Sequence, residues 1–378
     1  MTRIGAVRSA LPVHRYPQAE LTKAFAELSA TSGARRALLE RLHGNAGVDT
    51  RHTILPLPSY ASLDGIGPAN DLYIEGATDL GEQALRSALA AAGLGAREVD
   101  LLIVTSVTGV AVPSLDARLI PRLGLRSDVK RLPIFGLGCV AGAAGLARLH
   151  DYLLAWPQHT AALLAVELCS LTLPVTQATT PDMVVSGLFG DGATALVARG
   201  DQAAAGTNAG SNAGSNGNGG STGNGGSTGN AVGDGPQVIA SRSEVYPDTS
   251  DVLGWRLGTG GFRILLTAEL ADVVARHLSA GVSSFLAEHG LTPDDISSWV
   301  CHPGGPKVID AIQQSLKLPD SALEMSRRSL AEVGNMSSAS VLHVLQMTID
   351  ACPPPPGSAG LLIGLGPGVS VELVLLRW

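Results

Sequence analysis

Continuous apolar runs alternate with helix-like patterns along most of this chain. Residues 101–107 and 161–166 are almost wholly apolar, which is typical of strands buried on both faces. Residues 78–92 and 142–154 instead show the spacing of helices. Strands that alternate with helices in this way predict an α/β protein built on layered sheets.

The same order of elements repeats in the last third of the chain. We predict a helix over 267–288, a strand over 298–301, helices after Gly305 and Asn335, and strands near Leu361 and Val369. The chain therefore divides into two similar halves, 1–203 and 236–378.

The segment between the halves, 204–235, consists mainly of Gly, Asn, Ser and Thr. Within it NGGSTG at 218–223 recurs directly at 224–229. Such a segment has almost no apolar surface to bury, so its ordering entropy is not offset. We predict a disordered insertion or flexible tether.

The amino-acid composition disfavours several classes of function. The 378 residues are 45% hydrophobic and 16% charged with a net charge of −7, which indicates a large globular core and disfavours a nucleic-acid partner. The cysteines are too scattered for a zinc or disulfide pattern, so we expect a cytoplasmic protein without a metal. No apolar run approaches the length of about 18 residues that a membrane span needs.

Cys139 is the first candidate for chemistry. It follows a strand-like stretch that breaks at glycine, and a helix rich in small residues begins there. A helix N-terminus favours the ionised thiol, so this position predicts a reactive thiolate. A lone cysteine can equally be a small buried hydrophobe, and this alternative stays open at this point.

His302 and Asn335 occupy two further junctions between a strand or turn and a helix. His302 begins HPGGP at the end of a short strand, and Asn335 lies in GNMSS before a helix, where it could also serve as an N-cap. Cys, His and Asn suit either a papain-like hydrolase or a decarboxylating condensation. The second chemistry is favoured because the papain-type motif around the cysteine is absent and glycine-rich junctions are present.

Ordered motifs identify a family. They are GLGCVAG at 136–142, LFGDGA at 188–193, HPGGP at 302–306, GNMSS at 334–338 and GLGPG at 364–368. Together they resemble the type III polyketide synthases, the chalcone and stilbene synthase family. The resemblance implies a thiolase-type fold of two duplicated βαβαβαββ halves in α/β/α/β/α layers, and a homodimer.

The resemblance also implies roles for single residues. Cys139 corresponds to the family's acyl-carrying nucleophile, paired with a histidine that lowers its pKa, and His302 and Asn335 to its decarboxylating, enolate-stabilising pair. The positions that resemble substrate-binding ones are Phe189 and Phe262 at the neck of the coenzyme A tunnel, Thr176 and Ser337 in the cavity wall, Val112 reaching across the dimer interface, and Gly366 and Pro367 in the cavity backbone.

These roles predict an acyltransferase that needs acyl-CoA and malonyl-CoA but no other cofactor. It would load a starter on Cys139, extend it by decarboxylative Claisen condensation and release a cyclised product. The local sequence of residues 107–115 and 167–173 most resembles that of bacterial alkylresorcinol and alkylpyrone synthases, which implies a fatty acyl starter. The alternatives are a single condensation on a carrier protein, as in ketoacyl synthase III, a cysteine-dependent acyl hydrolase, and a degenerate binding module.

Overall fold

The computed structural model describes residues 1–378 except 64, 174–177, 204–234 and 259–260. Thr176 and nearly all of the predicted insertion therefore lie outside the described residues. A sheet of nine strands, in the order β11-β12-β13-β8-β1-β7-β6-β4-β5, organises the rest. Its strands are β1 (Thr2–Ala10), β4 (Leu101–Thr105), β5 (Lys130–Ile134), β6 (Thr160–Leu168), β7 (Asp191–Gly200), β8 (Gln237–Val245), β11 (Ile296–Cys301), β12 (Ala359–Gly366) and β13 (Ser370–Arg377).

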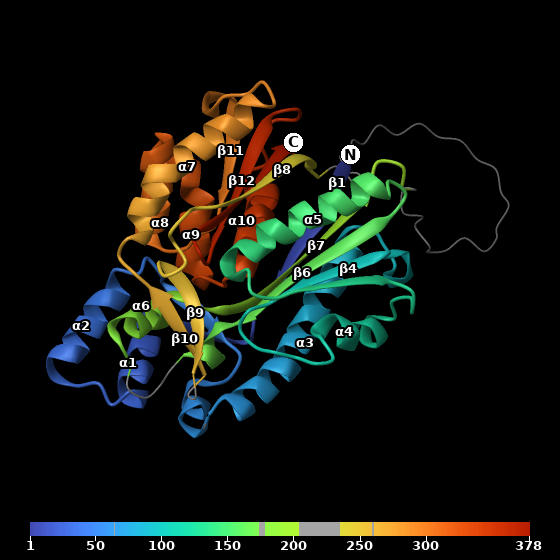
Figure 1. The fold of residues 1–378 in the computed structure, drawn as a ribbon. Coiled ribbons are helices and arrows are strands. Elements are labelled where there is room, and N and C mark those ends of the chain that lie inside the picture. The colour runs from blue at the N-terminus through green and yellow to red at the C-terminus, as the bar shows by residue number, and fades with distance from the viewer. Residues whose placement is uncertain (64, 174–177, 204–234, 259–260) are drawn as a thin grey trace, which may run out of the picture.

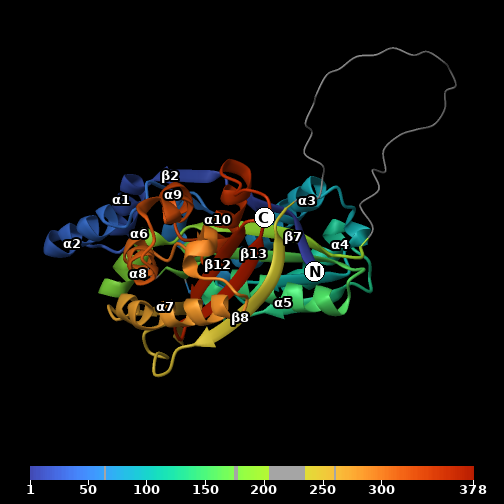
Figure 2. The ribbon, with the colours of Figure 1, turned by 90° about the horizontal axis from the view of Figure 1, so that it is seen from above.

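The strand pairing repeats between the two halves. β1 pairs antiparallel with β7 as β8 does with β13, and β6 pairs antiparallel with β7 as β12 does with β13. β4 and β6 are parallel, as are β11 and β12. The predicted α/β fold of two duplicated halves is confirmed, and the halves adjoin where β1 meets β8 (Figures 1 and 2).

Two buried helices form the central layer. They are α5 (Ala141–Ala155) and α10 (Ser338–Ala351), and their apolar side chains share one core with strands of both halves. α3 (Ile66–Ala91) and α4 (Leu115–Leu123) cover the outer face of the first half, and α7 (Leu270–Ala287) and α8 (Pro306–Leu316) that of the second. Because a strand buried on both faces needs apolar side chains throughout, the continuous apolar runs belong to this layering.

Gly142 brings the two central helices together. A Cβ atom there would lie 2.1 Å from the carbonyl oxygen of Ser338, so only glycine allows the start of α5 to approach the start of α10 this closely. The N-termini of the duplicated helices therefore meet in the middle of the molecule.

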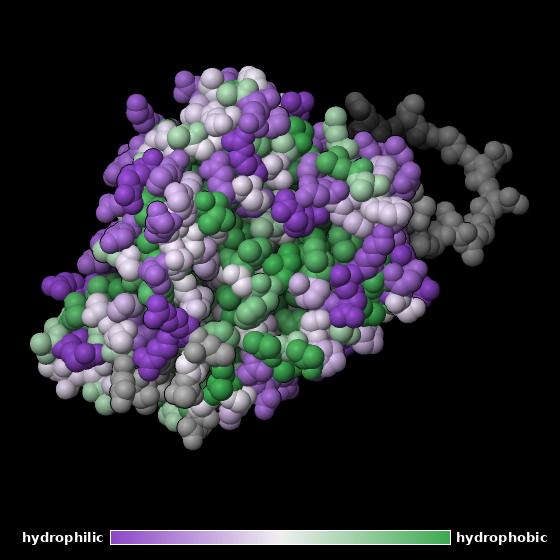
Figure 3. Space-filling view, in the orientation of Figure 1, coloured by the Kyte–Doolittle hydropathy of each residue, from purple (hydrophilic) through white to green (hydrophobic). Residues whose placement is uncertain are grey.

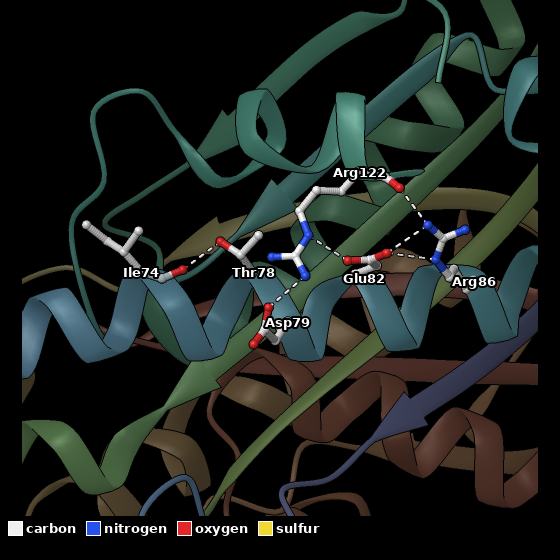
Figure 4. A network of polar contacts seen from close by, with 6 residues as sticks. All are labelled: Ile74, Thr78, Asp79, Glu82, Arg86 and Arg122. Carbon is white, nitrogen blue, oxygen red and sulfur yellow. Dashed lines mark hydrogen bonds and ion pairs between the residues drawn. The ribbon is translucent and has the colours of Figure 1, made fainter. Parts of the chain in front are cut away.

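Outside the sheet, α3 is longer than the predicted helix over 78–92. It begins at Ile66, after Gly65 at φ +82°, and Pro68 in its first turn needs no hydrogen-bonded N–H. Glycine, proline and polar residues in this first part interrupt the helical spacing of apolar residues, so the sequence did not predict it. Arg122 of α4 joins α3 through Asp79 at 2.7 Å and Glu82 at 2.6 Å, as Figure 4 shows.

The remaining helices and strands lie outside the nine-stranded sheet. They are α1 (Gln18–Leu28), α2 (Gly33–Gly44), α6 (Thr180–Leu188), α9 (Glu324–Val333), the pair β2 (His14–Pro17) and β3 (Thr50–Thr53), and the pair β9 (Leu253–Gly258) and β10 (Gly261–Leu266).

Candidate active site

Cys139 lies in a 3-10 turn, Gly138–Val140, that runs directly into α5. Gly138 has φ +56°, and a Cβ atom on it would lie 2.6 Å from the ring of Pro367. A Cβ atom on Gly366 would lie 2.7 Å from the backbone nitrogen of Val140. The expected helix-start position of the cysteine is therefore present, and the 364–368 backbone packs closely against its turn.

Asn335 occupies the equivalent turn before α10. Its side-chain Oδ1 accepts hydrogen bonds from the Ser337 backbone N–H at 2.8 Å and from the Ser340 hydroxyl at 3.4 Å. Because both acceptor contacts fall on Oδ1, the amide Nδ2 faces the opposite way as a donor. Ser337 itself has φ +48°, a strained conformation of the kind that clusters at functional sites.

Ser337 links the two turns. Its Oγ lies 3.4 Å from the Sγ of Cys139, while its backbone holds Asn335. Asn335 Nδ2 in turn lies 3.5 Å from the carbonyl oxygen of Gly304, in the loop that His302 begins. The predicted cysteine, asparagine and cavity serine therefore share one network of contacts that reaches the histidine loop.

His302 directly follows β11 and is 2% exposed. Its backbone N–H donates to the Ile363 carbonyl at 2.9 Å, which ties it to β12. Its buried Nδ1 has no hydrogen-bond partner in the part of the chain that the structure describes. Buried polar groups are rarely left unpaired, so an unpaired imidazole nitrogen marks a candidate for contact with a substrate.

The ionisation of the thiol differs from the prediction. Burial, together with the nearby carboxylate of Glu167, raises the pKa of Cys139 to about 12, and burial lowers the pKa of His302 to about 4. The loss of solvation outweighs the favourable helix terminus. Both side chains are therefore neutral at pH 7 in this structure.

Glu167 is a buried residue near the thiol that sequence reasoning missed. Its carboxylate accepts hydrogen bonds from the Val107 backbone at 3.0 Å, the Thr108 hydroxyl at 3.0 Å and the Ser338 hydroxyl at 2.5 Å. It thereby connects the end of β4 to the first residue of α10. Its position after an apolar strand was the available signal, because a lone acid at the end of a buried strand needs partners.

The two predicted aromatic residues, Phe189 and Phe262, lie on either side of a tryptophan that was not predicted. The ring of Trp255 lies 6.3 Å from that of Phe189 and 6.4 Å from that of Phe262, measured between centroids. Phe189 ends α6 and the other two lie on β9 and β10. Sequence reasoning did not single out Trp255, because the hairpin that brings it between the phenylalanines has no motif of its own.

Val112 lies on the surface, away from the contacts described above. It is 90% exposed, and Phe135 in the segment after the neighbouring strand β5 is 59% exposed. Figure 3 shows hydrophobic residues gathered across the middle of the face on which α5 lies in front in Figure 1. Thr176 cannot be placed, since it lies outside the described residues.

Three further residues are structural. Cys169 and Cys301 are buried core residues. Asp191 is a buried acid. It begins β7, is fully buried, and accepts hydrogen bonds from the backbones of Ser170 at 2.8 Å and Ile54 at 2.7 Å. Burial raises the pKa of Asp191 to about 6.

The described ranges contain neither a candidate metal site nor a candidate membrane span. No group of three or more His, Cys, Asp or Glu side chains there could hold a metal ion. Of the helices in those ranges, none combines the length and the apolar character that crossing a membrane requires.

The chain matches models of a known protein family over both halves. Residues 2–202 match the N-terminal domain, and residues 237–378 the C-terminal domain, of the chalcone and stilbene synthases.

Individual relatives agree with this match. A 1,3,6,8-tetrahydroxynaphthalene synthase of Streptomyces peucetius subsp. caesius is 52% identical over 378 residues, covering 100% of this chain and 93% of the relative. The enzyme of the same name from Streptomyces coelicolor is 31% identical over 359 residues, covering 95% and 88%. A crystal structure of 1,3,6,8-tetrahydroxynaphthalene synthase from Streptomyces coelicolor, described as a bacterial type III polyketide synthase, superposes with a TM-score of 0.87 at 29% identity, covering 100% and 99%.

Proposed function

The chain belongs to the chalcone and stilbene synthase family and is a type III polyketide synthase, and we propose that it builds a polyhydroxylated aromatic such as tetrahydroxynaphthalene from malonyl-CoA. The observation that carries this proposal is the 52% identity over the whole chain to a synthase of that name. The link from Cys139 through Ser337 to Asn335 supports the same chemistry.

The first step assigned to this site is acyl loading. His302 accepts the proton of the Cys139 thiol as the sulfur attacks a CoA thioester, and coenzyme A leaves as its thiol with that proton. Mutual attraction of the resulting thiolate and imidazolium opposes the burial penalty of each charge. The starter is then held as a thioester on Cys139.

The second step is decarboxylative condensation. Malonyl-CoA loses CO2 and its thioester carbonyl becomes an enolate oxygen, to which Nδ2 of Asn335 and the imidazole N–H of His302 donate hydrogen bonds. The enolate carbon attacks the Cys139 thioester, a carbon–carbon bond forms, and the thiolate is released. The extended chain, now on coenzyme A, returns to the cysteine for the next cycle.

Two starters are to be distinguished, a small malonyl-derived one and a fatty acyl one. Trp255 adds a large ring beside Phe189 and Phe262, which favours a small malonyl-derived starter. The fatty acyl starter and the alkylpyrone or alkylresorcinol product expected from the sequence rest only on the local resemblance of residues 107–115 and 167–173. Replacing Trp255 by Gly should increase the use of longer acyl-CoA starters, whereas Trp156→Gly, at the far end of α5 from Cys139, should not.

Incubation of the purified enzyme tests the proposal. With malonyl-CoA alone, mass spectrometry should detect an aromatic product whose ten ring carbons derive from malonyl units. A product that forms only when a fatty acyl-CoA is added would overturn the starter assignment. A single condensation on a carrier protein, or release of free acid without malonyl-CoA, would overturn the polyketide chemistry proposed for the site.

We also propose a homodimer. β5 is an edge strand of the sheet, Phe135 directly follows it, and the side chains of Val112 and Phe135 are 90% and 59% exposed. Large exposed apolar side chains that form a patch mark interaction sites. Light scattering should give twice the chain mass, and Val112→Asp together with Phe135→Asp should shift it toward the monomer.

A further inference from the structure

Arg51 is a buried charge that the proposed chemistry does not use. It lies on β3 and is 3% exposed. Burial lowers the pKa of its guanidinium to about 10, and the Asp191 carboxylate acts in the opposite direction, so the group is charged at neutral pH. A buried charge contributes little to stability compared with a well-packed apolar side chain, so its fixed directions of hydrogen bonding are the feature to explain.

These hydrogen bonds end at the C-terminus of α6. Arg51 Nη1 donates to the carbonyl oxygen of Phe189 at 2.6 Å, and its Nε donates to Oε1 of Gln18 at 3.1 Å. Gln18 Nε2 in turn donates to the Gly187 carbonyl at 2.8 Å. The last carbonyls of a helix have no partners within the helix and attract positive charge, so this pair of side chains holds the end of α6 in place.

The same backbone carries Asn335. The Asn335 N–H donates to the Leu188 carbonyl at 2.8 Å, and the Gly190 N–H donates to the Asn335 carbonyl at 3.0 Å. Directly before it, Gly334 has φ +73°, and a Cβ atom there would lie 2.9 Å from Cδ of Arg51. Arg51 therefore bonds to one strand of the Phe189–Asn335 bridge and packs against the turn that leads into the other.

We propose that Arg51 is a positioning residue for decarboxylation: it fixes the 187–190 backbone, and through it the direction of the Asn335 amide. It contacts no reacting atom. This inference rests on the proposed role of Asn335. Misplacement of a catalytic group by about 1 Å can reduce the rate on the order of 100-fold. Loosening the Phe189–Asn335 bridge should therefore lower the decarboxylation rate measurably.

The test is the steady-state rate of malonyl-CoA decarboxylation by the full-length enzyme. Arg51→Gln should lower kcat at least tenfold per folded molecule with little change in KM, and Arg51→Lys should fall between it and the wild type. Arg328→Gln, which removes an exposed arginine of α9 from its ion pair with Glu332, is the matched control and should retain the wild-type rate. If Arg51→Gln does not fold, Arg51→Lys and Gln18→Met carry the test, and each should lower kcat.

A double mutant separates positioning from general stability. In the Asn335→Ala background, adding Arg51→Lys should change kcat less than twofold, because the amide that Arg51 orients is gone. Equal losses in both backgrounds, or a wild-type kcat per folded molecule in the single variants, would overturn the inference. If Asn335→Ala itself decarboxylates at the wild-type rate, the proposed function of Asn335 fails instead.

Discussion

The turns before α5 and α10 occupy equivalent places in the two halves, yet they carry different chemistry. The first is a glycine-rich 3-10 turn with a thiol, Cys139, and its backbone is confined by the 364–368 run. The second holds an amide, Asn335, whose Oδ1 is occupied by its own turn and whose Nδ2 is left to donate. In the proposed chemistry, one turn supplies the nucleophile and the other a hydrogen-bond donor.

Duplication explains how the two groups meet. Because α5 and α10 are packed side by side with Gly142 against Ser338, their N-terminal turns lie next to each other. If the proposed roles hold, a duplicated scaffold needs only a change of side chain at one junction to combine covalent attachment with stabilisation of an anion. Ser337 is the direct contact between the two functions.

The largest expected effect tests the second turn and its neighbour. His302→Ala and Asn335→Ala should each slow malonyl-CoA decarboxylation about 100- to 1,000-fold, the usual cost of removing one donor to a developing oxyanion. Release of labelled CO2 measures this directly. Wild-type decarboxylation in either variant would show that its side chain does not stabilise the enolate.

A smaller effect is expected where the halves touch. Gly142→Ala would place a Cβ atom 2.1 Å from the Ser338 carbonyl and force α5 and α10 apart. We expect it to destabilise the fold by about 1–3 kcal/mol and to lower activity as the two turns separate. Gly67→Ala is the matched control, since a Cβ atom there meets nothing within 4 Å. Equal denaturation midpoints for the two variants would contradict this account.

The next effect in size is expected from acid, which should lower the free energy of unfolding. Burial lowers the pKa of His302 and His343 in the second half, and of His43 in the first, to about 4. Because these pKa values are depressed in the folded state, the stability that depends on neutral imidazoles is present above pH 6.5 and is lost as the pH falls toward 4. One pH unit below 6.5 costs about 1 kcal/mol for each histidine.

The noncatalytic His343 allows a direct check of this dependence. His343→Gln should make the free energy of unfolding less steep with pH between 6.5 and 5 than in the wild type. An unchanged slope would mean that His343 binds a proton equally well in both states.

The smallest effect concerns the outer surface of the first half. Arg122→Ala removes the contacts of α4 with Asp79 and Glu82 that Figure 4 shows. The side chains of Arg122 and Asp79 are 42% and 49% exposed, so we expect a loss of about 1 kcal/mol or less, reduced further by salt. Thermal unfolding at low and high salt measures it, and a loss as large as that of Gly142→Ala would contradict the expected ranking.

The sequence was sufficient for the fold and for the junctions that carry Cys139, His302 and Asn335, because apolar runs and glycine-rich turns are local signals. It could not predict the protonation of the thiol, since burial of Cys139 depends on segments distant in the chain. Trp255, Glu167 and Arg51 were missed for a similar reason. Each gains its meaning only from contacts that the fold creates, with Phe189, Ser338 and Gly334 respectively.

The division of labour between the two turns is tested most directly by Cys139→Ala, with CO2 release from malonyl-CoA and polyketide formation measured on the same sample. The account predicts that CO2 release persists while the polyketide disappears, because the donors of the second turn remain and only the attachment point is lost. Loss of both to the same extent, or continued polyketide formation, would contradict it.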